Sequence, residues 1–304
     1  MMNTTVMIEQ LNRDFSIDGV VTFTKGKGDL PNVSIHSASC TATISLLGGQ
    51  VLSFTPAGQQ QNLMFVSDNA HYQNGKAIKG GAPICWPWFG SHAKDTRLPF
   101  HGFVRNRLWQ VQSIKQTEQD NINITLVFDA TDETRNIWPY EFRLVQVITL
   151  SDSLAIELQS HNTGAQSFEL TQAIHTYFYV GDIQQTQVIG LDNKSYQDKV
   201  ENFAAKTQTG PVRFSGETDR IYQDVSYPLE IHDDALERKI IIESTGSSTA
   251  VVWNPWVDIA KTSADLGDND YKHFLCVETA NAADEVILVE SGQCSRLLAR
   301  YKIK

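Results

Sequence analysis

Long runs in which apolar and polar residues alternate limit how this chain can fold more than any other feature. In the run 121–128 every second residue is strongly apolar, and the same holds for 154–159. Successive side chains of a strand point to opposite faces, so a period of two is typical of strands with one buried face. Turn-forming residues separate further strand-like runs at 41–47, 141–150, 167–178, 239–243, 250–253, 274–278, 286–289 and 297–303. The pattern predicts an all-β fold, a large antiparallel sandwich or barrel whose edges are covered by loops.

Helical patterns are scarce. The best candidate is the short segment 198–207, so we expect few and short helices. No linker, charge block, repeat or low-complexity tract divides the chain. Its 304 residues could hold two medium domains, but large all-β folds often exceed the usual domain size. We predict a single β domain over residues 1–304.

Composition excludes several classes of protein. No run approaches 18 uninterrupted apolar residues, so we expect no membrane span, and the first ten residues lack the pattern of a secretory signal. The four cysteines, at positions 40, 85, 276 and 294, form no CxxC pair and suggest reduced thiols in a cytoplasmic protein. Lys and Arg number 25 against 35 acidic residues, which argues against nucleic acid as a partner. The sequence indicates no protein partner.

One segment reverses the acidic balance of the chain. Residues 76–107 contain six Lys or Arg and a single acid, Asp95, whereas the whole protein has a net charge of -10. A local excess of cations is what an anionic small ligand requires, because most of an acidic surface would repel it. Tryptophans 86, 88 and 109 offer apolar walls, and His92 and His101 can titrate near neutrality. The alternative is a packed loop rich in Gly, Pro and Trp, without a ligand.

The same segment carries a resemblance to a known family. Lys79-Gly80-Gly81-Ala82-Pro83-Ile84-Cys85-Trp86-Pro87-Trp88-Phe89-Gly90 resembles the Arg-Gly-Gly-X-Pro run of hexose-6-phosphate mutarotases (glucose-6-phosphate 1-epimerases) of the galactose mutarotase-like superfamily. Further matching pieces follow in the family's order: 101–106 (HGFVRN), 173–178 (AIHTYF), 218–222 (TDRIY), 252–256 (VWNPW) and 276–278 (CVE). The resemblance covers residues 35–300. It implies a many-stranded β-sandwich and an enzyme that interconverts the anomers of a hexose 6-phosphate, with glucose 6-phosphate the expected substrate, without metal or other cofactor.

Anomer exchange needs one base and one acid. A proton leaves the hydroxyl on C1 while another reaches the ring oxygen, so the ring opens and can reclose on the other face. The period of two sets His175 on one strand face with Ala173, Tyr177 and Tyr179, a face resembling a pocket floor. The resemblance implies that His175 is the general acid and Glu278, at the end of an apolar run, the general base. Without it, His175 could equally be a hydrogen-bonded core residue, and Glu278 the solvated end of a strand.

Four more positions complete the expected site. The resemblance implies that Asp219 holds sugar hydroxyls, that His101 supports the ring-oxygen side, and that Lys79 and Arg105 bind substrate. By themselves these residues could be a loop acid, a turn histidine and solvated surface charges. The chain departs from the family in two places: Lys79 stands where better-known members have arginine, and Phe100 where some have glutamine, so substrate identity is less determined than reaction class.

Three other functions stay open. The first is an aldose 1-epimerase acting on unphosphorylated sugars, and the second a carbohydrate-binding module without turnover, against which the presence of both His175 and Glu278 argues. The third is a metal-dependent β-barrel enzyme. It would require two or three histidines at ligand spacing, a pattern that His92, His101 and His175 do not show.

Overall fold

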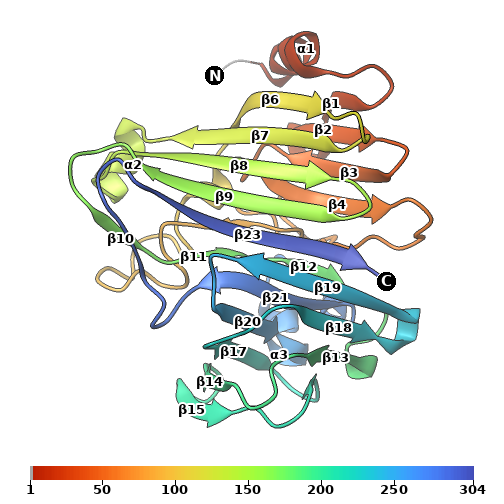
Figure 1. Cartoon of the computed structure of the whole chain (residues 1–304), viewed down its shortest axis with the longest axis vertical. Helices are drawn as coiled ribbons and strands as arrows, with labels where there is room; N and C mark the ends of the chain where they lie inside the picture. Colours follow the sequence, from red (N-terminus) through yellow and green to blue (C-terminus); the bar gives the residue numbers. More distant parts are fainter. Residues whose placement is uncertain (1–2) are drawn as a thin grey trace.

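The computed structural model describes residues 3–304 and has the architecture of a β-sandwich (Figure 1). One layer is an antiparallel sheet of nine strands, in the order β16 (Val212–Arg213), β13 (Thr186–Ile189), β18 (Leu229–Asp233), β19 (Arg238–Thr245), β23 (Cys294–Ile303), β9 (Leu154–Asn162), β8 (Phe142–Leu150), β7 (Ile122–Asp129) and β6 (Gln110–Gln116). The all-β antiparallel sandwich expected from the alternating pattern is confirmed. Long strands such as β8, buried at every second residue, account for that pattern.

The facing layer consists of two sheets. A four-stranded sheet contains β1 (Val21–Lys25), β2 (Pro31–His36), β3 (Cys40–Ser45) and β4 (Gln50–Pro56). An eight-stranded sheet follows the order β15 (Ala204–Thr207), β14 (Ser195–Asp198), β17 (Thr218–Tyr222), β20 (Thr249–Asn254), β21 (Phe274–Asn281), β11 (Gln172–Ile174) and β5 (Ile84–Cys85), and β12 (Tyr177–Tyr179) also pairs with β21. A small separate ladder joins β10 (Phe168–Leu170) to β22 (Ile287–Val289).

The hydrophobic core lies between the layers. One buried cluster extends from Val21 to Ile303 and takes residues from the nine-stranded sheet and from both facing sheets. Since one core joins both ends of the chain, we infer that it folds as one domain, although residues 1 and 2 of the predicted span lie outside the described residues. No helix in the described part of the chain is long and apolar enough to cross a membrane.

The helices are α1 (Thr4–Phe15), α2 (Asp132–Ile137) and α3 (Trp256–Thr262), together with short 3-10 turns. The helix expected at 198–207 is wrong, because this segment completes the eight-stranded sheet as the end of β14, a turn and β15. The backbone of Asn202 and Phe203 has positive φ values of 53° and 62°, which an α-helix cannot contain. In addition, β14 pairs with β17 on its other side, so sheet pairing outweighs the helix-forming side chains of the segment.

Helix α1 lies against the free edge of β1. Asn3 caps it by accepting a hydrogen bond from the backbone N–H of Thr5, and the apolar side of the helix packs on the core. The side chain of Asn12 contacts the edge strand through both ends of its amide: its Oδ1 accepts from the N–H of Phe23, and its Nδ2 donates to the carbonyl of Phe23. One residue of the exposed strand edge is thereby paired.

Candidate active site

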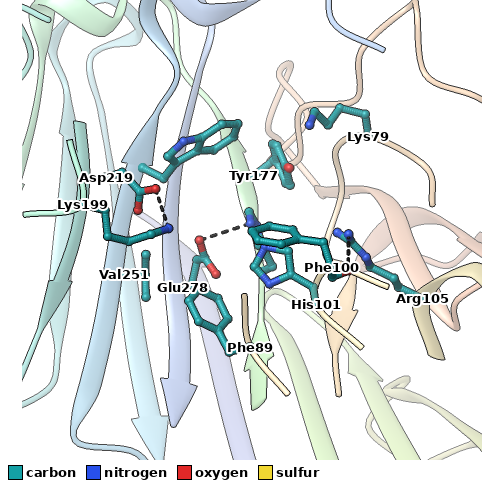
Figure 2. A pocket seen from close by; sticks show the side chains of 12 residues that line it. Lys79, Phe89, Phe100, His101, Arg105, Tyr177, Lys199, Asp219, Val251 and Glu278 are labelled. Atoms are coloured by element: carbon teal, nitrogen blue, oxygen red, sulfur yellow. Dashed lines mark hydrogen bonds and ion pairs between the residues drawn. The ribbon is translucent and has the colours of Figure 1, made fainter. Parts of the chain in front are cut away.

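A cavity of about 210 Å³ lies on the face of the eight-stranded sheet that points away from the core (Figure 2). Alternation along the strands separates the two faces: on β21, Leu275 and Val277 enter the core, whereas Cys276 and Glu278 lie on the cavity side. The segment from β11 to β12 divides in the same way. As the alternation predicted, His175 and Tyr177 line the cavity, while Ile174, Thr176 and Phe178 face inward, Ile174 and Phe178 within the core and Thr176 hydrogen-bonded to Tyr301.

The floor of the cavity is built from rows of residues that lie side by side across the strands. Paired ladders align Tyr177 with Cys276, Cys276 with Trp253, and Trp253 with Asp219. In the next row, Glu278 pairs with Val251 on one side. Aromatic rings therefore alternate with small and carboxylate side chains on one surface, as a pocket for a polar ring with apolar faces requires.

His175 and Glu278 meet at the bottom of this cavity. The Nε2 atom of His175 lies 3.3 Å from Oε1 of Glu278, and the Glu278 side chain is only 1% exposed. The backbone N–H of His175 donates to the carbonyl of Pro83, and its ring stacks on Tyr177 at 4.9 Å between centroids, so its position is fixed from two sides. His175 Nδ1 and Glu278 Oε2 are buried without a hydrogen-bond partner among residues 3–304. Buried polar atoms without partners are rare, and in a cavity they mark positions that a ligand can satisfy.

Burial dominates the protonation of this pair. It lowers the pKa of His175 well below the usual value, and Arg105 lowers it further. It raises the pKa of Glu278 well above the usual value; Asp219 adds to this effect, and Lys199 and Arg105 oppose it. Both trends disfavour two charged groups, so the pair shares one proton over a wide range of pH. Such a pair can take a proton from one oxygen of a ligand while giving one to another.

The glycine-rich run forms the wall beside His175. The carbonyl of Gly81 accepts from the N–H of Tyr177, so the run adds a further edge next to the segment that carries the histidine. Gly81 has φ +63°, and a Cβ atom there would lie 2.3 Å from the carbonyl oxygen of Val51, so a larger residue would not fit. Lys79 emerges from this wall. Its Nζ lies 3.6 Å from Oδ1 of Asp265 and 5.6 Å from the centre of the Trp253 ring.

The second wall is the segment that holds His101 and Arg105. The N–H of Gly90 donates to Nδ1 of His101 at 3.0 Å, so Nδ1 carries no proton. Burial, followed by the charges of His175 and Arg105, lowers the pKa of His101 well below its usual value, and the neutral ring therefore presents Nε2–H as a donor. Nη2 of Arg105 donates to the carbonyl of Phe100 at 2.8 Å, and Phe100 stands half-exposed at the mouth of the cavity.

All six residues predicted for the site line this one cavity: Lys79, His101, Arg105, His175, Asp219 and Glu278. Six other residues line the cavity without having been predicted as site residues, although Tyr177 was expected on the same strand face as His175: Phe89, Phe100, Tyr177, Lys199, Val251 and Trp253. The largest omission is Lys199, whose Nζ lies 2.6 Å from Oδ2 of Asp219. It escaped notice because it fell inside the segment expected to be helical. Within residues 3–304, no group of three His, Cys, Asp or Glu side chains has an arrangement that could hold a metal ion.

Comparisons with known proteins agree with the fold. Residues 31–302 match the family model described as aldose 1-epimerase. A protein of Escherichia coli strain K12 with the provisional name glucose-6-phosphate 1-epimerase is 35% identical over 257 residues, which cover 84% of this chain and 85% of that protein. A similarly named protein of Cenchrus ciliaris is 35% identical over 279 residues, covering 88% of this chain and 83% of that one.

Solved structures give the same result. The crystal structure of a provisionally named mutarotase from Salmonella typhimurium has a TM-score of 0.89 and 30% identity, and the superposition covers 98% of this chain and 99% of that one. A galactose mutarotase related enzyme of Lactobacillus acidophilus, at 14% identity and a TM-score of 0.69, shares the fold over 90% of this chain and 97% of its own. With the family model matching nearly the whole sequence, this chain belongs to the aldose 1-epimerase family.

Proposed function

We propose that the protein is a cofactor-free mutarotase that interconverts the α and β anomers of a hexose 6-phosphate, with glucose 6-phosphate as the preferred substrate. The observation that carries the proposal is the contact of His175 with Glu278 at 3.3 Å, below a cavity that is also lined by three cationic side chains. The names of the Escherichia coli and Cenchrus ciliaris relatives refer to the same reaction.

The geometry of the pair suits a reaction at one carbon. The hydroxyl oxygen and the ring oxygen of a cyclic sugar are both bonded to C1, so an acid and a base that act on them must themselves be neighbours. Glu278 takes the proton of the C1 hydroxyl, and His175 gives a proton to the ring oxygen as its bond to C1 breaks. The products are an aldehyde at C1 and a free hydroxyl on the former ring oxygen. After rotation about the C1–C2 bond, the reverse transfers close the ring and restore both protons.

Other side chains of the cavity bind and orient the sugar. Nε2–H of His101 is a donor beside the ring of His175, whose centre lies 5.4 Å away, and supports the ring-oxygen side. Asp219 accepts hydrogen bonds from sugar hydroxyls. Arg105 and Lys79 are both on the opposite side of the cavity from Asp219 and Lys199 (Figure 2). These two cations form the phosphate subsite, in which Arg105 can bind two phosphate oxygens at once.

The state of the cysteines indicates the kind of compartment in which the protein works. All four cysteines are free and three of them are buried, which fits a reducing compartment. We therefore expect the enzyme and its sugar phosphate to meet in the cytoplasm.

The test is anomer exchange measured by NMR, with glucose 6-phosphate, glucose and galactose compared at equal concentration. We expect catalytic amounts of the protein to accelerate exchange of glucose 6-phosphate well above the spontaneous rate, and far more than that of the free sugars. Faster exchange of the free sugars would favour the aldose 1-epimerase alternative, and no acceleration of any sugar the binding module. Loss of exchange in EDTA that one divalent ion restores would favour the metal enzyme.

A further inference from the structure

Lys199 lines the cavity but has no role in the proposed mutarotase reaction. It directly follows β14, and its backbone N–H donates to the carbonyl of Asp219 at 2.8 Å, so the two residues lie opposite each other across the strands. Its Nζ lies 2.6 Å from Oδ2 of Asp219, with exposed side-chain fractions of 23% for Lys199 and 18% for Asp219. Figure 2 shows the ammonium end of Lys199 between the carboxylates of Asp219 and Glu278.

The position of Lys199 bears on the ionisation of Glu278. A general base has to be ionised, but Glu278 is almost completely buried and shares the cavity with a second carboxylate. Burial in the first place, and Asp219 after it, raise the pKa of Glu278 and so favour its inactive, protonated form. The pKa of Glu278 stays well above the usual value even with cations nearby, so each positive charge that lowers it increases the fraction of the carboxylate that can act as a base.

The groups that surround Glu278 include few sources of such a charge. Its titratable and charged neighbours are His175 and Tyr177 on the segment from β11 to β12, Cys276 on β21 itself, Cys85 on β5, Asp219 on β17, Lys199 after β14, His101 and Arg105 on the second wall, and Tyr301 on β23. Among these, Lys199 and Arg105 lower the pKa of Glu278. Once a phosphate binds Arg105, the charge of Arg105 is neutralised, and Lys199 remains to offset Asp219.

We propose that Lys199 is a positioning residue of the reaction: its ammonium group holds the Asp219 carboxylate in place and supplies the positive charge that lets Glu278 act as an ionised base. The inference rests on the proposed role of Glu278. It goes beyond that role because it makes one ion pair serve both sugar binding and proton transfer. Asp219 can then bind hydroxyls beside the base without suppressing the ionisation of the base.

The decisive measurement is the pH dependence of Lys199→Met relative to the native enzyme. Removing the lysine raises the pKa of Glu278, so the ratio of variant to native kcat/KM falls most at low pH and recovers as the pH rises. We expect a loss of about tenfold on the acid side for each unit by which the pKa rises. Titration of the substrate phosphate at pH ~6 affects both proteins equally and cancels in the ratio. A ratio that is constant with pH would show that Lys199 only contacts sugar or stabilises the fold, and would overturn the proposal.

Three further variants separate charge from structure. Lys199→Arg keeps the charge and should keep the native pH dependence of kcat/KM. Lys199→Met combined with Asp219→Asn removes both charges, and its pH dependence should return most of the way to that of the native enzyme. Lys206→Met is the matched control, since Lys206 lies in the same hairpin, pairs with Asp198 and does not line the cavity. If the double variant shows the same pH dependence of kcat/KM as Lys199→Met alone, the proposed balance of charges is wrong.

A direct titration makes the test independent of turnover. With 13C-labelled glutamate, the Glu278 carboxyl resonance, identified by its loss in Glu278→Gln, reports the pKa in the native protein and in Lys199→Met without substrate. A higher pKa in the variant supports the proposal even if glucose 6-phosphate is not the substrate, and an unchanged pKa refutes it even if anomer exchange is catalysed.

Discussion

His175, in the short gap between β11 and β12, lies opposite Glu278 on the neighbouring antiparallel strand β21, although 103 positions separate the two in the sequence. The register that pairs Ile174 with Thr279 and Tyr177 with Cys276 leaves His175 facing Glu278. Opposite residues in such ladders have Cβ atoms about 4.5–5.5 Å apart, which explains the close contact of the two side chains. A shift of one residue would turn Glu278 into the core, so the pairing of β21 with its neighbours is itself a requirement for chemistry.

The first prediction concerns this pair. His175→Asn and Glu278→Gln nearly preserve shape but remove proton transfer, so each should lower kcat by at least about 100-fold while sugar binding changes little. Calorimetric binding and NMR exchange on the same samples measure both quantities. His161→Asn and Glu157→Gln are matched controls on β9, away from the cavity, and should retain native rates. A tenth of native activity in either active-site variant is incompatible with the assigned roles.

The pH profile should be bell-shaped. On the acid side both His175 and Glu278 are protonated and no base is left; on the alkaline side both are deprotonated and no acid is left. Burial lowers the pKa of His175 and raises that of Glu278, so the two limbs belong to the pair as a unit. The measurement is kcat/KM against pH, with the phosphate titration followed separately by 31P NMR. A profile with a single limb would contradict a one-proton pair.

His101 should act through Nε2 rather than Nδ1, because Nδ1 already accepts from Gly90. His101→Asn can keep an acceptor near Gly90 but loses the donor that reaches the sugar, whereas His101→Gln can replace that donor. We therefore expect the larger loss of kcat/KM in His101→Asn, roughly tenfold or more for one hydrogen bond to a reacting oxygen. Equal losses in the two variants would indicate that the histidine only supports the loop.

The two cations of the proposed phosphate subsite, Arg105 and Lys79, should contribute unequally to the binding of a phosphorylated sugar. Within residues 3–304, the side chain of Arg105 hydrogen-bonds only to the carbonyl of Phe100, whereas Lys79 already pairs with Asp265. Arg105→Met should weaken the binding of glucose 6-phosphate by about 1.5–3 kcal/mol and should have little effect on the binding of glucose. Lys79→Met should weaken the binding of glucose 6-phosphate by less. Asp265→Asn should strengthen the binding of the phosphorylated sugar, because it removes the carboxylate that pairs with Lys79. Arg97→Met, in the same basic segment but outside the cavity, serves as control. Equal losses on both sugars would show that Arg105 binds hydroxyls instead.

Much of the site could be predicted from the sequence because it depends on local periodicity. Alternation along 170–179 assigned His175 and Tyr177 to one face, and that face lines the cavity. What alternation cannot provide is the partner strand: the contact of His175 with Glu278 depends on pairing between distant segments. The resemblance to a family, and not the pattern, brought those two residues together.

The failure at 198–207 has a different cause. Lysine, glutamate and alanine side chains there favour a helix, but two positive φ angles and pairing with β17 make a hairpin. Lys199 and its contact with Asp219 were hidden by this error. Helix α1 was also missed, although the spacing of Ile8, Leu11 and Phe15 carried a helical signal.

The contact of Asn12 with Phe23 has a consequence for how the molecules behave in a crowded solution. An unpaired outer strand is a template on which a second chain can add its own strand and begin a fibril. A side-chain amide that occupies both backbone groups of one residue in the middle of β1 interrupts this template, and the body of α1 shields the rest. Removal of the first sixteen residues would leave the catalytic cavity untouched, but it would expose the edge of β1 to pairing with strands of other molecules.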